Sequence, residues 1–294
     1  MKLLALVLVL LLRPIWHVKG IGVERFFIGI GRTIANVFPE SLPAPMRLAA
    51  NVVVVPLILA ILFLLFDKSL YSLPSFILGL LILVDCLLCR NLDAENSDWL
   101  KVWIGKEWQR AYEMIETKRA IAPLDSVSQI HAMYLRIWSE VWLQQVFSTV
   151  FWYGLFGPEG AVLYRLALAV AAQSSSDETP TSERELVAFA RQFISGMDWL
   201  PARLLATTFI FTGNLSYAFS RVLDNWIDYN LTAGEVIAHT AQQATHVEPL
   251  PEEHSEQFIS VGALQIETLH DVLRRSFLIW VVVFAVLTIV GWVF

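Results

Sequence analysis

Long apolar runs recur along the chain and are separated by shorter polar stretches. A helix needs about 20 apolar residues to cross the hydrocarbon core of a bilayer, because each residue advances about 1.5 Å along its axis. Five runs approach that length, namely residues 48–66, 73–89, 143–172, 204–222 and 277–294, and a shorter sixth run covers residues 3–12. The pattern predicts an all-α, polytopic transmembrane protein with five or six spans and helical loops.

The first run, residues 3–12, has the length of a signal-peptide core, and Lys2 precedes it. No small-x-small cleavage site follows, so we favour an uncleaved first span over a signal peptide. Five Lys or Arg residues lie in the segment 13–47. The positive-inside bias therefore places that segment in the cytoplasm.

The runs divide the chain into five parts. These are an N-terminal membrane region of three spans (1–92), a cytoplasmic helical loop (93–142), a central membrane region (143–222), an acidic helical loop (223–275) and a C-terminal membrane helix (276–294). The sequence Gly157-Pro158-Glu159-Gly160 interrupts the central region, because Pro removes a backbone donor and Gly weakens a helix. We favour one crossing followed by an interfacial helix; a hairpin of the two halves is the alternative.

Apolar residues recur every three or four positions in the loop after the third span, which is typical of amphipathic helices. Those that predict one helix are Leu100, Trp103, Ile104, Trp108, Ala111 and Ile115. Asp125 or Ser126 is placed to cap a second helix that continues into the fourth run, with Gln129 as the capping partner of Ser126. In the acidic loop, residues 249–256 are expected to link two helical pieces.

Composition agrees with a membrane protein, since 56% of the residues are hydrophobic and 16% charged, against about 25% charged in soluble domains. The net charge of −6 argues against nucleic-acid binding, which needs a basic face. Cys86 and Cys89 lie in an apolar run and are interpreted as helix fillers rather than a redox pair. Residues 224–273 contain acidic side chains and no Lys or Arg, which is typical of a solvated face; a basic partner is the alternative.

Signatures of nucleotide and metal chemistry are missing from the sequence. There is no Gly-x-x-x-x-Gly-Lys-Ser/Thr loop. His239 and His246 are seven residues apart, whereas helices that bind zinc usually carry ligands four residues apart. We predict no metal and no cofactor; ATP and Mg²⁺ would enter only under the enzymatic alternative below.

Asp85 lies inside the third run, where a charge is costly unless it is paired or solvated. We interpret it as neutralised by a basic group such as Arg165 or as protonated. Ion or proton transport through Asp85 is the alternative function.

Polar residues also gather at the ends of the predicted spans. One helix face carries Arg136, Glu140 and Gln144 at four-residue spacing. An ion pair within the helix is enough to explain this spacing. In the segment 198–203, Asp198 is placed to cap the fifth span, Pro201 suits its first turn, and Arg203 can reach lipid headgroups. The functional alternative is that Asp198 and Arg203 meet Glu140 and Arg165 at the membrane surface.

Residues 151–165 read Phe-Trp-Tyr-Gly-Leu-Phe-Gly-Pro-Glu-Gly-Ala-Val-Leu-Tyr-Arg. They resemble the Phe-Trp…Gly-x-x-Gly-Ala-x-x-Tyr-Arg segment of the superfamily that joins the cobalamin-pathway membrane synthases CobD/CbiB with the AmpE proteins. Residues 198–203, Asp-Trp-Leu-Pro-Ala-Arg, are similar to its Asp/Asn-Trp-x-Pro-x-Arg segment, and residues 281–291 resemble the AmpE tail. The likeness covers most of the chain.

The departures favour the AmpE branch. Glu140 matches the Glu of the synthases' Glu-Asn-x-x-Asp-Gly element, but Val141 and Gln144 stand where its Asn and Asp would be. The synthases' His-x-Ser-Pro-Asn-x-Gly stretch is echoed only by Asn230 and Gly234. These losses weaken the expectation of catalysis.

The resemblance implies a multi-pass protein of the bacterial inner membrane with a regulatory or sensory role in β-lactamase induction and cell-wall recycling. The expected partners are the lipid bilayer, an anionic small-molecule ligand and cell-wall recycling proteins. We expect no binding of nucleic acid. One alternative is an ATP-dependent, amide-forming adenosylcobinamide-phosphate synthase. The other is a small polytopic transporter.

The resemblance also implies one polar cluster at the membrane surface. Its members are Glu140, Trp152, Gly157, Gly160, Tyr164, Arg165, Asp198, Pro201, Arg203 and Asn230. The glycines would allow close backbone approach, and the two arginines could hold an anionic headgroup or phosphate.

Overall fold

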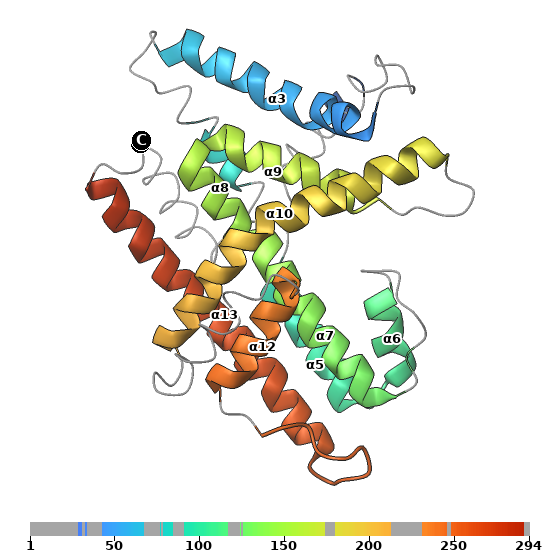
Figure 1. Ribbon diagram of the computed structural model, residues 1–294. Coiled ribbons are helices and arrows are strands. Elements are labelled where there is room, and N and C mark those ends of the chain that lie inside the picture. The colour runs from blue at the N-terminus through green and yellow to red at the C-terminus, as the bar shows by residue number, and fades with distance from the viewer. Residues whose placement is uncertain are drawn as a thin grey trace. The chain divides into compact units, whose positions relative to one another are not determined.

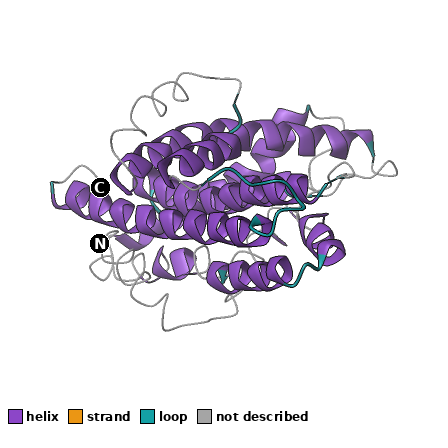
Figure 2. Cartoon of the chain, turned by 90° about the horizontal axis from the view of Figure 1, so that it is seen from below, coloured by secondary structure: helices purple, strands orange, loops and turns teal. Residues whose placement is uncertain are grey.

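The computed structural model describes residues 29–30, 33, 43–67, 77, 79–84, 91–116, 124, 126–173, 180–212, 231–245 and 248–290. Within these ranges the chain forms helices, turns and short connections, with no strand (Figure 2). The prediction of an all-α protein is confirmed for this part of the chain. Contacts divide the chain into two compact units, one of Met1–Arg90, Ser148–Asp198 and Val281–Phe294, the other of Asn91–Phe147 and Trp199–Trp280.

The first unit contains α3 (Ala44–Asp67), α8 (Ser148–Phe156), α9 (Pro158–Ala171) and the beginning of α10 (Thr181–Thr212), all labelled in Figure 1. The face of α3 that packs into the core with α9 consists of Leu48, Val52, Val55 and Leu59. Helix α10 adds Leu186, Ala190 and Ile194, again at four-residue spacing. The apolar period of each helix thus sets the side that enters the core.

Helix α3 has the length and composition of a membrane span. Its segment Ala44–Leu62 has 19 residues and a mean hydropathy of 2.1, and no other helix among the described residues passes the same test. The side of α3 away from the core exposes Val53, Leu57 and Ile61. The span predicted at 48–66 is therefore a helix able to cross a membrane, whereas the total of five or six spans stays a prediction.

The predicted Gly-Pro break separates α8 from α9. Gly157 has φ 76°, a left-handed conformation that favours glycine. The two helices then pack against each other so closely that a Cβ on Gly160 would lie 2.5 Å from the carbonyl oxygen of Trp152. Helices α8 and α9 are therefore in close contact next to the break, while the choice between one crossing with an interfacial helix and a hairpin stays a prediction.

The second unit contains α5 (Leu92–Ile104), α6 (Trp108–Glu116), α7 (Val127–Trp142), the π-helix η2 (Leu143–Phe147), α12 (Ala233–Thr245), and parts of α10 and α13 (Phe258–Ile289). Ser126 caps α7 as predicted, because its Oγ accepts a hydrogen bond from the amide of Gln129 at 3.2 Å. The loop before α13 separates two helices, as predicted for residues 249–256.

The single helix predicted from Leu100 to Ile115 is wrong. Helix α5 ends at Ile104, and α6 begins at Trp108. The break follows from Gly105 together with Lys106, whose φ is 56°. A left-handed residue cannot continue a right-handed helix, so the apolar spacing alone did not reveal this turn.

The cap predicted at Asp198 is also wrong. Helix α10 runs without interruption from Thr181 to Thr212, so Asp198 and Pro201 lie in its interior. The helix extends N-terminally because Leu186, Ala190 and Ile194 bury an apolar face in the first unit. Helix α13 is continuous across residue 276, and the domain boundary predicted there stays a prediction.

Tryptophan side chains dominate the core of the second unit. Trp99 stacks on Tyr134 with ring centroids 3.8 Å apart, which joins α5 to α7. Trp103 is fully buried and donates its indole N–H to the carbonyl of Ile259 on α13 at 3.0 Å. Gly262, one turn further along α13, lies directly under this indole, where a Cβ would collide with the ring.

We expect Gly262→Ala to lower the free energy of unfolding by about 1–3 kcal/mol, because the added methyl group must displace the buried Trp103. Gly196→Ala is the matched control, since Gly196 also lies inside a helix but has no atom within 4 Å of an added Cβ. That control should be neutral or stabilising by up to about 1 kcal/mol. Chemical denaturation in detergent measures the unfolding free energy of each variant. Equal changes for Gly262→Ala and Gly196→Ala would contradict the packing of Gly262 against Trp103.

Candidate functional site

Asp198 is the centre of a buried polar contact in the first unit. Its side chain is 2% exposed. The Oδ1 atom accepts hydrogen bonds from Ser148 Oγ at 2.6 Å and from the hydroxyl of Tyr164 at 2.7 Å. Helices α8, α9 and α10 therefore meet at one carboxylate, which we call the Asp198 cluster. Ser148 was not predicted; the only signal was a small polar residue inside an apolar run.

Other predicted site residues lie in the same unit as this cluster. Arg165 follows Tyr164 on α9 and is 5% exposed, so a cation is buried in this unit as well. Trp152 lies on α8, and its ring stacks on Phe156 with centroids 5.8 Å apart. Gly157 and Gly160 shape the connection between α8 and α9. The structure thus gathers the residues of the first motif and Asp198 of the second in one unit.

Arg203 and Pro201 belong to the part of α10 that lies in the second unit. The Arg203 side chain is fully buried. Its guanidinium lies 4.2 Å from the ring centroid of Trp199 and donates to the carbonyl of the same residue at 3.2 Å. A cation over an indole face is favourable, so Trp199 holds this guanidinium within its own helix.

Glu140 lies on α7 and faces the first turn of α12. The amide of Gln144 donates to its Oε1 at 3.5 Å. A Cβ on Gly234 would lie 3.3 Å from Cβ of Glu140, so the small residue at this position lets the two helices approach closely. Asn230, the last member of the predicted cluster, lies outside the described residues, as do Asp85, Cys86, Cys89 and His246.

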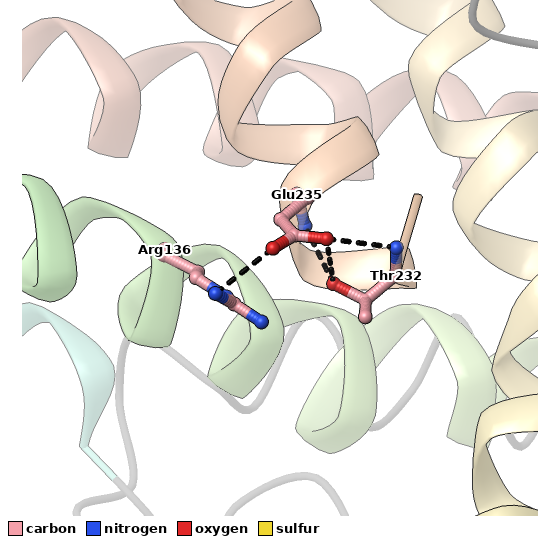
Figure 3. Close-up of polar contacts among 3 residues, drawn as sticks. All are labelled: Arg136, Thr232 and Glu235. Atoms are coloured by element: carbon pink, nitrogen blue, oxygen red, sulfur yellow. Dashed lines mark hydrogen bonds and ion pairs between the residues drawn. The ribbon is translucent and has the colours of Figure 1, made fainter. Parts of the chain in front are cut away.

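The Arg136 guanidinium forms an ion pair at 2.9 Å with Glu235 on α12 (Figure 3). The ion pair of Arg136 with Glu140 stays a prediction. Glu235 also accepts from the amide and hydroxyl of Thr232, at 2.9 and 2.8 Å. This is a capping box, in which Thr232 and Glu235 satisfy free N–H groups at the start of α12. The sequence signal of this box is the spacing Thr-x-x-Glu at residues 232–235.

His131 is a buried titratable group that the sequence did not single out. It lies on α7, is 2% exposed and has its Nε2 atom 3.1 Å from the carbonyl oxygen of Gly262. Burial disfavours the imidazolium and lowers the pKa of His131 from 6.5 to about 4, although the bond to Gly262 opposes this shift. The ring is therefore neutral at pH 7 and donates its Nε2–H to Gly262.

These arrangements can bind and position polar groups. The Asp198 cluster combines a carboxylate with two hydroxyl donors, and a buried arginine lies beside its tyrosine in the chain. Among the described residues there is no group of three or more His, Cys, Asp or Glu that could hold a metal ion. Whether all the predicted members form one cluster stays a prediction, since they are divided between the two units.

Comparison with curated proteins and with solved structures gives no match. A family model does match, and its description is regulatory signalling modulator protein AmpE. The match extends over residues 1–294 and so includes both units and every residue of the predicted cluster. The chain belongs to the AmpE family.

Proposed function

We propose that this chain is a multi-pass protein of the bacterial inner membrane that regulates β-lactamase induction in response to cell-wall recycling. Family membership supports a regulatory signalling role in general terms. The link to β-lactamase, the partners in cell-wall recycling and the number of spans are parts of the proposal.

Exposed apolar helix faces support the membrane location. The outward side of α3 carries Val53, Leu57 and Ile61, and the end of α13 exposes Val282 and Val286. Water would solvate these rows of aliphatic side chains poorly, whereas lipid chains would cover them without cost. The bilayer is therefore the partner that we assign to both faces.

The observation that carries the proposal is the hydrogen bond between Tyr164 and Asp198. These residues belong to the two family-like motifs and lie 34 positions apart, yet they share a bond of 2.7 Å in the interior. A buried polar contact among three helices can act as a two-state element. It is stable when all of its hydrogen bonds are formed, and it costs free energy when one of them is missing, so intermediate arrangements are disfavoured. We assign to Arg165, which is buried in the same unit as this contact, the binding of an anionic ligand that shifts the contact between states.

The test is the induction ratio, the β-lactamase activity with a β-lactam inducer divided by the activity without it. Deletion of the gene should change this ratio several-fold. Tyr164→Phe, which removes one hydroxyl and little volume, should reproduce the deletion while the protein stays at its normal level in the membrane. Asp98→Asn is the control, since its side chain is 64% exposed on α5. An unchanged ratio after deletion would refute the regulatory function.

One observation favours the enzymatic alternative enough to include it in the test. Glu140 and Gly234, which match positions of two synthase motifs, lie against each other in the second unit. The same strains should therefore be assayed in a background that lacks its cobinamide-phosphate synthase. Restored cobalamin-dependent growth would replace the regulatory proposal by a synthase function, and continued absence of growth is the expected result.

A further inference from the structure

A pocket of about 480 Å³ lies within the second unit, between α7, α12, α13 and the loop that precedes α13. Its lining consists of Ser128, His131, Ala132, Leu135, Ala238, His239, Ala241, Gln242, Pro249, Leu250, Gln265 and Leu269. We call it the α7–α12 pocket. Its volume falls within the range of about 300–1,000 Å³ that is usual for small-molecule sites. None of the residues implied by the family resemblance lines it.

Three of the eight positions at which α7 and α12 line the pocket carry alanine, and these small side chains help to leave the space open. Ala132 of α7 and both Ala238 and Ala241 of α12 contribute to its wall. Elsewhere α7 fills the interior of the unit with Trp138 and Trp142, each no more than 1% exposed. Larger side chains at the three alanines would close the space.

The lining has a definite chemical character. Aliphatic side chains predominate, with amide, hydroxyl and imidazole groups among them. No carboxylate, ammonium or guanidinium group is present among its described lining residues. An ionised ligand would find no carboxylate, ammonium or guanidinium group among these residues, and a charge without such a partner is costly to bury. An uncharged ligand loses little hydration free energy when it enters the pocket.

The loop that forms one wall is held at both ends. Gln265 of α13 donates its amide to the carbonyl of Glu248 at 2.8 Å. The carboxylate of Glu253 accepts from both the amide and the hydroxyl of Ser128, each at 2.9 Å, at the start of α7. Pro249 and Leu250 lie between these two anchors and line the pocket. The wall is therefore a built part of the unit, positioned by residues that themselves line the space.

We propose that the α7–α12 pocket binds an uncharged small molecule with an apolar body and one hydrogen-bonding carbonyl or hydroxyl group. The body packs against Leu135, Leu250 and Leu269, and the polar group meets the amide of Gln242 at the edge. The described lining does not include Arg165, to which the anionic ligand is assigned, so this proposal does not depend on the proposed function.

Photolabelling of the full-length protein in lipid nanodiscs tests the site with benzophenone, an uncharged diaryl ketone. Mass spectrometry locates the labelled peptides. We expect saturable labelling of peptides containing residues 132–135, 238–242 or 265–269, and competition by excess diphenylmethanol, which is uncharged and similar in size. The carboxylate analogue 4-benzoylbenzoate should label them at least about tenfold less, because it would bury an unpaired charge.

Ala238→Leu fills the pocket and should lower labelling by about tenfold or more. Ala94→Leu is the matched control, since Ala94 is exposed on α5, and labelling should stay at the wild-type level. Competition by diphenylmethanol tests the wild-type protein even if Ala238→Leu does not fold. Labelling that diphenylmethanol leaves unchanged, or that is stronger with 4-benzoylbenzoate than with benzophenone, would overturn the proposal.

Discussion

Asp198→Ala is expected to lower the free energy of unfolding by about 2–5 kcal/mol, because it leaves two buried hydroxyl groups without their shared acceptor. Ser148 and Tyr164 are both fully buried, so water cannot replace the carboxylate. Asp198→Asn keeps an oxygen at the same place and should cost less. Denaturant titration in detergent, followed by circular dichroism, measures these differences.

Asp98→Ala is the control for this loss. Asp98 forms an exposed i,i+3 ion pair with Lys101 at 3.0 Å, with side chains 64% and 72% exposed, so its removal should cost less than about 1 kcal/mol. Tyr164→Phe combined with Asp198→Ala should cost less than the sum of the single variants, since both remove the same hydrogen bond. Equal losses at Asp198 and Asp98 would contradict the buried cluster.

The second large effect concerns pH and His131. Its pKa is 6.5 in the unfolded chain and about 4 in the folded protein. As pH falls below 6.5, the unfolded chain binds a proton at His131 that the folded protein does not, so stability present at pH 7 is lost as the pH falls toward 4. The contribution of this one residue between pH 7 and pH 5 is about 2 kcal/mol.

His131→Gln isolates this effect, because an amide can still donate to Gly262 but does not titrate. The variant should lose about 2 kcal/mol less than the wild-type protein when the pH is lowered from 7 to 5. His254→Gln is the control, since His254 is exposed in the loop before α13. If the unfolding free energy of His131→Gln falls as steeply with pH as that of the wild type, His131 is not buried in the neutral state.

Local features were predictable from the order of residues. The cap at Ser126 and the break at Gly157 follow from the chemistry of one turn, and the buried stripe of α3 follows from a helical period. The failures have local reasons too. The break at Lys106 carries no distinct apolar signal, and the start of α10 lies seventeen residues before Asp198 because an upstream stripe packs into the first unit.

By itself, the sequence determined the helical class, the apolar faces, the scarcity of charge and the two family-like motifs, because each is a property of residues close together along the chain. Only the tertiary structure decided that Asp198 accepts hydrogen bonds from Ser148 and Tyr164, which lie 50 and 34 residues away in the chain. It also decided that Gly262 lies under Trp103. Such contacts depend on where the surfaces of packed helices meet. No spacing within one helix encodes that meeting point, so the buried partners and the α7–α12 pocket became visible only in the folded chain.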